Sequence, residues 1–358
     1  MRRNTALFLL ILSAAAASSA QVSQSAISIG DEPAKQSTLE DAQQLAGKGR
    51  LDQALNILGQ LAAQIPEPAG AERLRGIIHY QKEQLPQAAD AFAKAIQQDA
   101  GDHESVEMEG VTLFRLGQPA RALPYLEQAH TPGKVAEQEA PGTSAANVEP
   151  NYVLGLCYSD LARYDDARHA FAAQYGFQPD SAEAYLLAGR LFLRRELRDP
   201  ASAQAARALE INARLPLAHE LMGEAALSKG DIPGAIKEFE AERAINPLNP
   251  DLYDRLGDAY LRTGQLPEAQ QALNRAVLLE PNATGPYILL GQTFLKMKQP
   301  IQALQYLVRA ERMDPSNYIT HNLLGQAYKA TGQAAEANRE FKRVVEIQHR
   351  DDPKPAEK

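Results

Sequence analysis

The strongest constraint in this sequence is a 34-residue register of glycines and alanines. Six glycines stand 34 residues apart, and an alanine follows each of them after twelve residues. The glycines are Gly155, Gly189, Gly223, Gly257, Gly291 and Gly325, and the alanines are Ala167, Ala201, Ala235, Ala269, Ala303 and Ala337. A fixed period of this length indicates one supersecondary unit copied end to end, each unit being too small to bury its own apolar face. We therefore expect one elongated stack of repeats in which these glycines and alanines form the packing contacts.

The composition favours helices that pack closely through small side chains. Of the 358 residues 44% are hydrophobic but only 6% are aromatic, and there is no tryptophan. Alanine, leucine, glutamine and glutamate, which favour helices, are abundant, whereas strand-forming runs of valine, isoleucine and threonine are missing. The sequence predicts an all-α protein.

One unit, residues 250–283, has the pattern of a helical hairpin. Its first half carries an apolar face at i, i+3, i+4 and i+7, made of Tyr253, Leu256, Gly257 and Tyr260. Gly264 suits the cap that ends this helix, because glycine adopts positive φ without steric cost. Pro267 can begin the next helix, because its missing N–H falls in the first turn. The second half repeats apolar residues at i, i+4 and i+7, namely Ala269, Leu273 and Ala276.

This spacing resembles the tetratricopeptide repeat. The first helix of that repeat carries an aromatic residue, then Leu-Gly, then Tyr; the second carries Ala, an aromatic or aliphatic residue, Ala and a closing Pro. The unit that follows fills all eight positions with Tyr287, Leu290, Gly291, Phe294, Ala303, Leu307, Ala310 and Pro315. The resemblance implies a right-handed superhelical solenoid of about nine tandem helix-turn-helix repeats.

Six of these repeats are expected in residues 148–351, and three degenerate ones in residues 35–136. In the degenerate part the 34-residue alanine spacing continues, but Arg75 and Glu109 replace the usual leucine before the glycine. Repeats should therefore cover almost all of the chain and leave no room for a separate catalytic domain.

The two parts are joined where the alanine spacing lengthens by 11 residues. We place this flexible insertion at residues 137–147, within a segment punctuated by proline and glycine, residues 131–148. A lid or docking loop and a tolerated surface insertion both fit it. A disordered linker is expected at residues 21–34 and a disordered tail at residues 352–358.

The amino terminus has the pattern of a secretory signal peptide at residues 1–20. Arg2 and Arg3 precede an apolar stretch, residues 6–17, which is too short to span a bilayer, and small residues follow as a cleavage site. No later segment could span a bilayer either. We expect an exported protein without a membrane span after signal removal, periplasmic or, as the alternative, extracellular.

The charge limits the classes of partner. Loss of Arg2 and Arg3 takes the formal net charge from −8 to about −10, and an acidic chain does not favour nucleic acid or anionic lipid. Cys157 is the single cysteine, so an internal disulfide is excluded. The partner is expected to be a protein or peptide that is neutral or basic where it touches.

In the family that the sequence resembles, the first helices line a concave groove and the second helices lie outside it. The groove positions would be those three before, one after and five after each repeat glycine. They are Tyr152, Arg190, Arg194, Glu220, Glu224, Asp254, Asp258, Arg262, Gln292, Lys296, Asn322 and Gln326. The set changes from arginines through acids to amides, which suits an extended peptide with basic side chains over the acids. Solvated helix faces, with charges compensated by Arg255 and Arg262, fit the same pattern.

The sequence offers no motif for catalysis or for a cofactor. A Gly-rich phosphate loop, a Gly-x-Ser-x-Gly elbow and a His-Glu-x-x-His pair are absent, and no two of the seven histidines have ligand spacing on one helix face. Cys157 occupies a position where other units have alanine, which is typical of a buried packing residue. We predict no catalytic residue, no cofactor and no metal ligand.

Together these observations predict a non-enzymatic scaffold or adaptor that binds a peptide segment of an envelope protein in its concave groove. Two alternatives stay open: a self-associating structural component of an envelope assembly, and an accessory subunit of an envelope enzyme complex. The last helix, residues 336–348, carries Val344, Val345 and Ile347 with no further repeat to cover them. It either ends the array with a polar cap or provides a surface for a homo-oligomer.

Overall fold

The structure is a computed structural model that describes residues 38–130 and 150–351. In these residues the chain forms eighteen helices in nine successive pairs, with no strand. The first helices of the pairs are α1 (Leu39–Gly47), α3 (Ala71–Gln81), α5 (His103–Arg115), α7 (Pro150–Asp160), α9 (Ala182–Arg194), α11 (Ala218–Ser228), α13 (Pro250–Thr263), α15 (Thr284–Lys296) and α17 (Tyr318–Ala330). The second helices are α2 (Leu51–Leu61), α4 (Leu85–Gln98), α6 (Pro119–Ala129), α8 (Tyr164–Tyr175), α10 (Arg198–Ile211), α12 (Ile232–Ile245), α14 (Leu266–Leu279), α16 (Pro300–Met313) and α18 (Ala334–Asp351).

The all-α repeat solenoid predicted from the register is confirmed by these nine pairs. The expected signal peptide (1–20), linker (21–34), insertion (137–147) and tail (352–358) lie outside the described residues. Within the described ranges, no helix combines the length and the apolar character needed to cross a bilayer.

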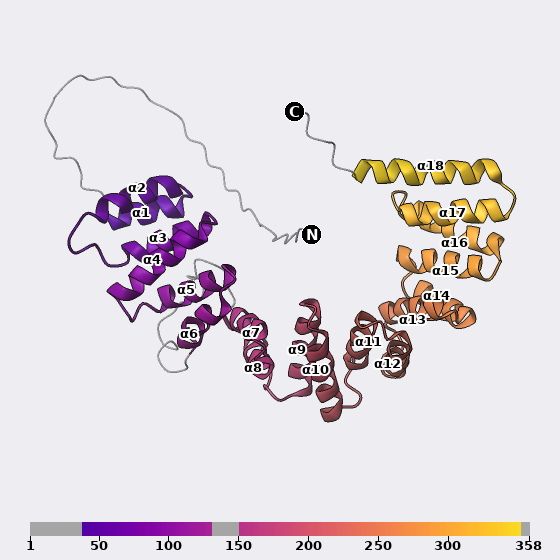
Figure 1. Ribbon diagram of the computed structural model, residues 1–358, viewed down its shortest axis with the longest axis horizontal. Helices are drawn as coiled ribbons and strands as arrows, with labels where there is room; N and C mark the ends of the chain where they lie inside the picture. The colour runs from indigo at the N-terminus through magenta and orange to yellow at the C-terminus, as the bar shows by residue number, and fades with distance from the viewer. Residues whose placement is uncertain (1–37, 131–149, 352–358) are drawn as a thin grey trace, which may run out of the picture.

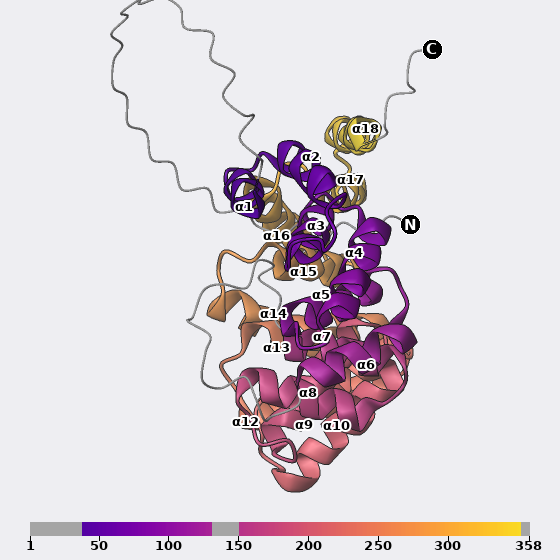
Figure 2. The same ribbon diagram turned by 90° about the vertical axis from the view of Figure 1, so that its left-hand side faces the viewer.

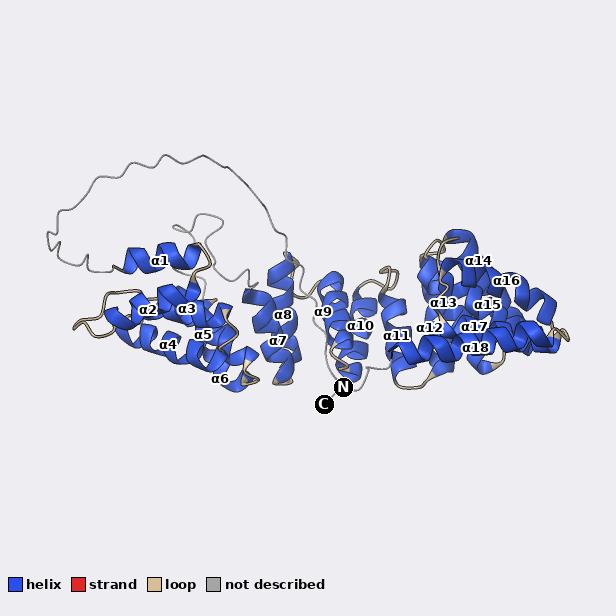
Figure 3. Cartoon of the chain, turned by 90° about the horizontal axis from the view of Figure 1, so that it is seen from above, coloured by secondary structure: helices blue, strands red, loops and turns tan. Residues whose placement is uncertain are grey.

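The pairs follow one another along an open arc (Figure 1). Each helix packs against its neighbours in sequence, and most odd-numbered helices also touch the next odd-numbered helix, as α13 does with α15. In the middle of the arc the odd-numbered helices lie on the inner side and the even-numbered helices outside. In the view turned by 90° the first and last pairs lie at the same end, opposite α9 and α10 (Figure 2). From above, the molecule is elongated, with α1–α6 at one end and α13–α18 at the other (Figure 3).

The two helices of a pair come together at the repeat glycine. A Cβ built on Gly257 would lie closer than 3.0 Å to Leu273 Cγ of the second helix, and one on Gly325 would lie 2.5 Å from the Phe341 ring. Side chains of Phe92, Leu126, Phe171, Phe239 and Leu307 face the corresponding glycines of the other pairs in the same way. The six register alanines are at most 3% exposed. Glycine is thus required at this position because a large apolar side chain occupies the space of its missing Cβ.

The fifth pair makes the same contact with a residue from the next pair. Its second helix has the small Ala205 where most other pairs have phenylalanine or leucine, so the position opposite Gly189 would be empty. Leu221 of α11 fills this space, and a Cβ on Gly189 would lie 2.7 Å from Leu221 Cδ2. The joint between the fifth and sixth pairs therefore also completes the core of the fifth pair.

The turn inside each pair repeats in register as well. The predicted cap at Gly264 is confirmed, since its φ is 78° and Gln265 N–H donates to Tyr260 O at 2.9 Å. Positive φ recurs at the equivalent positions Gly49, Glu83, Gly117, Ala162, Glu196, Gly230, Lys298 and Gly332. Four of these are not glycine, so their turns hold a left-handed backbone that costs roughly 1 kcal/mol each relative to glycine.

Glu109 is a buried acid in a position that four of the nine pairs fill with leucine. It lies on α5 beside the repeat glycine and is 3% exposed. Burial raises the pKa of Glu109 to about 7, an effect that Arg121 opposes and Asp90 reinforces. Its Oε2 has no hydrogen-bond partner among the residues that the structure describes. The third pair thus carries an ionisable group in its core.

The glycine contact predicts opposite effects for two glycine-to-alanine changes. Gly257→Ala should lower the free energy of unfolding by about 1–2 kcal/mol, because the overpacking against Leu273 outweighs the gain in helix propensity. Gly59→Ala is the matched control, since Gly59 lies in α2 with nothing within 4 Å of its Cβ position, and it should raise stability by about 0.5–1 kcal/mol. Urea unfolding measures both. Equal effects of the two changes would contradict the packing role.

Glu109 predicts a pH-dependent gain of stability when its charge is removed. Its pKa in the fold, about 7, lies above the ordinary 4.5, so the cost of its charge develops from pH 4.5 to 7 and is complete above pH 7. Glu109→Gln should raise the free energy of unfolding by about 2–3 kcal/mol at pH 8 and leave it nearly unchanged at pH 4. Urea titrations at both pH values test this, and a gain that does not depend on pH would exclude buried charge as the cause.

Candidate functional site

The predicted groove residues lie on α7, α9, α11, α13, α15 and α17, the helices of the inner side. The structure exposes five of them to solvent: Arg194, Arg262, Lys296, Asn322 and Gln326. Six are half-buried, namely Tyr152, Arg190, Glu224, Asp254, Asp258 and Gln292, and Glu220 is buried. Because this degree of exposure differs within the set, its members do not contribute equally to the inner surface.

Glu220 and Glu224 of α11 are tied to the next repeat by one arginine. Arg255 Nη2 of α13 lies 2.6 Å from Glu224 Oε1, and its Nε lies 3.7 Å from Glu220 Oε1. Asn249 Nδ2 also donates to Glu220 Oε2 at 2.8 Å. Glu220 is only 5% exposed, and burial raises its pKa against the opposing effect of Arg255. Glu220 therefore acts in the joint between the sixth and seventh pairs and is not accessible to a ligand.

Asp254 of α13 is the acid of this row that the fold leaves without a partner. Its Oδ1 is buried and accepts no hydrogen bond from any described residue, and no ion pair to it is formed in the described ranges. The carboxylate faces the start of α15, where a Cβ on Gly285 would lie 3.6 Å from its Oδ2. Burial, together with the nearby Asp258 and Asp251, raises the pKa of Asp254 to about 6. Asp254 is therefore close to its point of titration at neutral pH.

Asp258 lies one turn further along α13 and is more open to solvent. Arg262 of the same helix is its cation, with Nη1 3.6 Å from Asp258 Oδ2, an i,i+4 pair that is about half-exposed on both sides. Such a pair contributes little to stability, roughly 0.3–0.5 kcal/mol. The Asp258 carboxylate can therefore exchange its internal partner for another cation at small cost.

The residues on either side of the acids make mainly internal contacts. Lys296 Nζ donates to Leu261 O of the preceding first helix at 3.2 Å, and Gln326 Nε2 donates to Asn322 Oδ1 at 3.1 Å. Tyr152 lies against the core, with its ring 5.7 Å from that of Phe171 on α8. Of the three zones expected from the sequence, the arginine zone has Arg190 half-buried and Arg194 exposed, and the acids are divided among different partners. Within the amide zone Gln326 and Asn322 form a local group, and Tyr152 packs inside its own pair.

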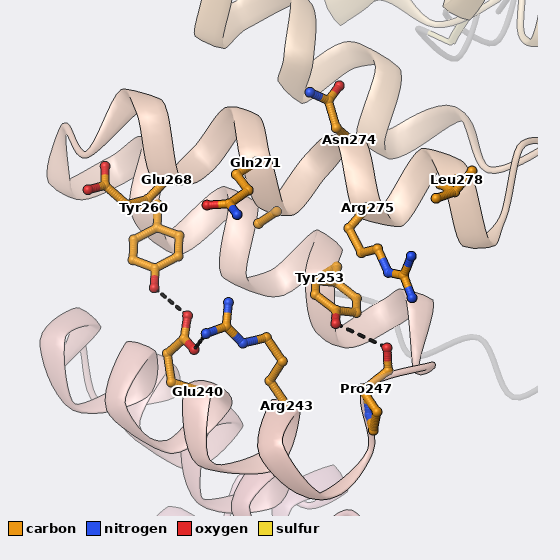
Figure 4. A pocket seen from close by; sticks show the side chains of 11 residues that line it. Glu240, Arg243, Pro247, Tyr253, Tyr260, Glu268, Gln271, Asn274, Arg275 and Leu278 are labelled. Atoms are coloured by element: carbon orange, nitrogen blue, oxygen red, sulfur yellow. Dashed lines mark hydrogen bonds and ion pairs between the residues drawn. The ribbon is translucent and has the colours of Figure 1, made fainter.

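A pocket of about 700 Å³ is lined by residues of α12, α13 and α14 (Figure 4). Its walls are Glu240, Arg243, Pro247, Tyr253, Tyr260, Glu268, Gln271, Ala272, Asn274, Arg275 and Leu278. The polar groups at its base satisfy one another: Tyr260 Oη donates to Glu240 at 2.5 Å, Glu240 pairs with Arg243, and Tyr253 Oη donates to Pro247 O at 3.0 Å. Tyr253, Tyr260, Glu240 and Arg243 thus already have partners within the protein.

Cys157 lies in the packed interior, as its position in the repeat predicted. It is fully buried, its Sγ lies 3.1 Å from Pro119 O, and burial raises the pKa of its thiol to about 11. A thiol in this state is a poor nucleophile at neutral pH.

Family models give the class of the protein. One tetratricopeptide repeat model matches residues 226–289, and a second matches residues 39–103 and 288–353. The chain belongs to the tetratricopeptide repeat family. Proteins of this family are protein-interaction scaffolds, and this repeat protein is one of that class. No curated protein matches it.

Several solved structures resemble the tetratricopeptide array over about half of its length. YrrB, described as a TPR protein with an unusual peptide-binding site, is 21% identical, with 52% of this chain and 95% of that chain covered and a TM-score of 0.47. MamA from Desulfovibrio magneticus RS-1 is 23% identical, with 49% and 98% covered and a TM-score of 0.47. PilF of Pseudomonas aeruginosa is 21% identical, with 46% and 76% covered and a TM-score of 0.42. These likenesses concern the fold alone.

The unpaired carboxylate predicts that Asp254 lowers stability at neutral pH. Its pKa in the fold, about 6, lies above the ordinary 3.8, so the cost appears between pH 3.8 and 6 and is complete above pH 6. Asp254→Asn should raise the free energy of unfolding by about 1 kcal/mol at pH 7.5, a value reduced by partial exposure, and should have no effect near pH 3.5. The matched control is Asp258→Asn, which should change stability by less than about 0.5 kcal/mol. Urea unfolding at the two pH values measures the stability of both variants. A loss of stability in Asp254→Asn would refute the assignment of Asp254 as an unpaired, destabilising carboxylate.

Proposed function

We propose that this repeat protein is a non-enzymatic adaptor that holds an extended segment of another protein along the inner side of its arc. Basic side chains of the segment pair with Asp254 and Asp258, and its backbone groups hydrogen-bond to Gln292 and to the amides of α17. An extended backbone needs partners that both donate and accept, and amide side chains do both.

The observation that carries this proposal is the unpaired carboxylate of Asp254. A buried charge without a partner lowers stability, whereas its neighbours Glu220 and Glu224 are held by Arg255. A cation from a bound segment would supply the missing partner, and Asp258 beside it would add a second, solvent-accessible carboxylate. The acidic net charge of −8 favours the same kind of segment at longer range.

The compartment is part of the proposal. The pattern of residues 1–20 supports export, so we place the adaptor in the periplasm and its partner among the envelope proteins. The extracellular space is the alternative for a chain with this kind of leader.

Self-association through α18 is the alternative function. Its apolar candidate is Val345, which is 50% exposed, while Val344 and Ile347 are half-buried. Lys342, Arg343 and Glu346 are exposed around Val345, which favours a polar cap. Light scattering that finds a dimer at micromolar concentration would support self-association instead. An accessory role in an enzyme complex would appear as an enzyme among the captured partners.

The adaptor function predicts that capture depends on the inner acids. A photo-crosslinking residue is placed at position 292 on the inner helix α15, and at position 274 in the outer pocket as the matched control. Both crosslinking variants are expressed in the cells that naturally produce this protein. We expect an adduct with an envelope protein from position 292 only.

The charge requirement is tested on the captured partner. The double variant Asp254→Asn, Asp258→Asn should weaken binding at least about tenfold at pH 7.5, while Glu268→Gln on α14 should leave it unchanged. Binding should also weaken as the pH falls through 6, because Asp254 takes up a proton there. Adducts from position 274 only, or equal binding by the double variant, would contradict the proposal. Asp254→Asn is expected to be more stable at this pH, so unfolding would not explain a loss of binding.

A further inference from the structure

Three side chains of metal-ligand type converge at the last joint of the array. Glu311 of α16, His321 of α17 and Glu340 of α18 each place one ligand atom within 4.8 Å of the other two. His321 is 1% exposed, and both glutamates are half-buried. The three helices lie side by side at the carboxyl-terminal end of the arc (Figure 1). We propose that this cluster binds one divalent transition-metal ion of the zinc type.

The hydrogen bonds of His321 leave one ring nitrogen for a cation. Its Nε2 lies 3.0 Å from Pro315 O, and because a carbonyl only accepts, Nε2 carries the hydrogen. A neutral ring then turns the lone pair of Nδ1 toward Glu340 Oε2, which is 2.7 Å away and is also an acceptor. A positive charge must lie between two facing acceptors, as either a proton or a metal ion. A histidine that donates one nitrogen to a backbone carbonyl and binds metal with the other is the usual arrangement in metal sites.

Glu311 favours the metal ion over the proton. A proton on His321 gives one positive charge against two carboxylates, whereas a divalent ion balances both and leaves the ring neutral. Both carboxylates act on the same region, since Glu340 and Glu311 help burial to raise the pKa of the neighbouring Tyr328. The opposing cation there is Arg339, which also lies 3.7 Å from Glu336.

The repeat register supplies an internal comparison. In the sixth pair, 102 residues earlier, His219 Nδ1 lies 2.7 Å from Glu238 Oε2, so the same histidine–glutamate pair is present. The position that matches Glu311 is Leu209 of α10 in the fifth pair, so a third ligand is missing at that joint. In the seventh and eighth pairs tyrosine takes the place of histidine, and Tyr253 and Tyr287 donate to the carbonyls of Pro247 and Pro281 at 3.0 and 3.1 Å. Of these joints, only the one between the eighth and ninth pairs combines this histidine with two acids.

The ligand chemistry selects the class of metal. One imidazole nitrogen with two carboxylate oxygens suits Zn²⁺, whereas Ca²⁺ and Mg²⁺ prefer oxygen ligands alone. Zinc binds such atoms at about 2.0–2.2 Å, and two ligand atoms of a tetrahedral ion are farther apart than the 2.7 Å between His321 Nδ1 and Glu340 Oε2. Glu340 must therefore move back from the ring to admit the ion, Glu311 must approach it, and water can complete the coordination. The ion would join α18, which has no further repeat to cover it, to α16 and α17.

The test is a zinc titration of the full chain after treatment with a chelator, against a competing chromophoric chelator. We expect one high-affinity Zn²⁺ per chain, and no binding of Ca²⁺ in the same assay. Co²⁺ in place of zinc should give the visible absorption of a nitrogen- and oxygen-ligated ion.

Two variants use residues that the array itself places in these positions. Glu311→Leu copies Leu209 of the fifth pair, and His321→Tyr copies Tyr253 and Tyr287 of the seventh and eighth, so both should fold, as circular dichroism checks. Each should weaken zinc binding at least about tenfold, and Glu238→Gln in the other histidine–glutamate pair should leave it unchanged. Absence of zinc uptake would show an imidazolium–carboxylate ion pair only and would overturn the proposal. Zinc uptake that both variants retain would place the ion elsewhere and would overturn it as well.

Discussion

The contact between the repeat glycine and a large apolar side chain of the second helix is the constraint on which the structure depends. Its short distance brings two helices together at the same point in seven of the nine pairs, from Gly76 with Phe92 to Gly325 with Phe341. Because the helices meet in the same way each time, the first helices follow one another on the inner side of the arc. The fifth pair shows how strict this constraint is, since Leu221 of the next pair supplies the side chain that Ala205 lacks.

The same geometry leaves the residues beside the glycine free to vary, and there stability and binding are in conflict. Glu220 satisfies its charge inside the joint with Arg255 and Asn249, which stabilises the stack but removes it from the surface. Asp254 occupies the same position in the next repeat, three residues before the repeat glycine. Its Oδ1, however, has no hydrogen-bond partner among the described residues. A carboxylate of this kind is costly in the free protein, and it would gain a partner from the cationic segment that we propose as the ligand.

The sequence predicted the features that depend on a single helix or on its neighbour in sequence. The nine pairs and the cap at Gly264 follow from spacing along one chain, so the register was sufficient to find them. The burial of Glu220 depends on how Arg255 of the next repeat is oriented, which spacing does not give. The cluster of Glu311, His321 and Glu340 draws one residue from each of three helices, so a search for ligand pairs on one helix face missed it. Its sequence signal is a departure from the register: Glu311 stands where Leu209 stands three repeats earlier.

The acidic residues that depart from the repeat register therefore differ in which group compensates their buried charge. Glu242 replaces a small alanine and is compensated in part, since Leu217 N–H donates to its Oε1 at 2.7 Å while its buried Oε2 has no partner among the described residues. Glu109 Oε2 has no hydrogen-bond partner among the described residues, and a proton neutralises the Glu109 carboxylate up to about pH 7. Asp254 likewise depends on a proton below about pH 6, but it lies on the inner side, where the cation of a ligand can replace that proton. At Glu311 and Glu340 the neighbouring His321 adds a nitrogen ligand, so that a metal ion can take the place of the proton. The position of an uncompensated acid in the array thus determines whether a proton, a ligand or a metal ion completes it.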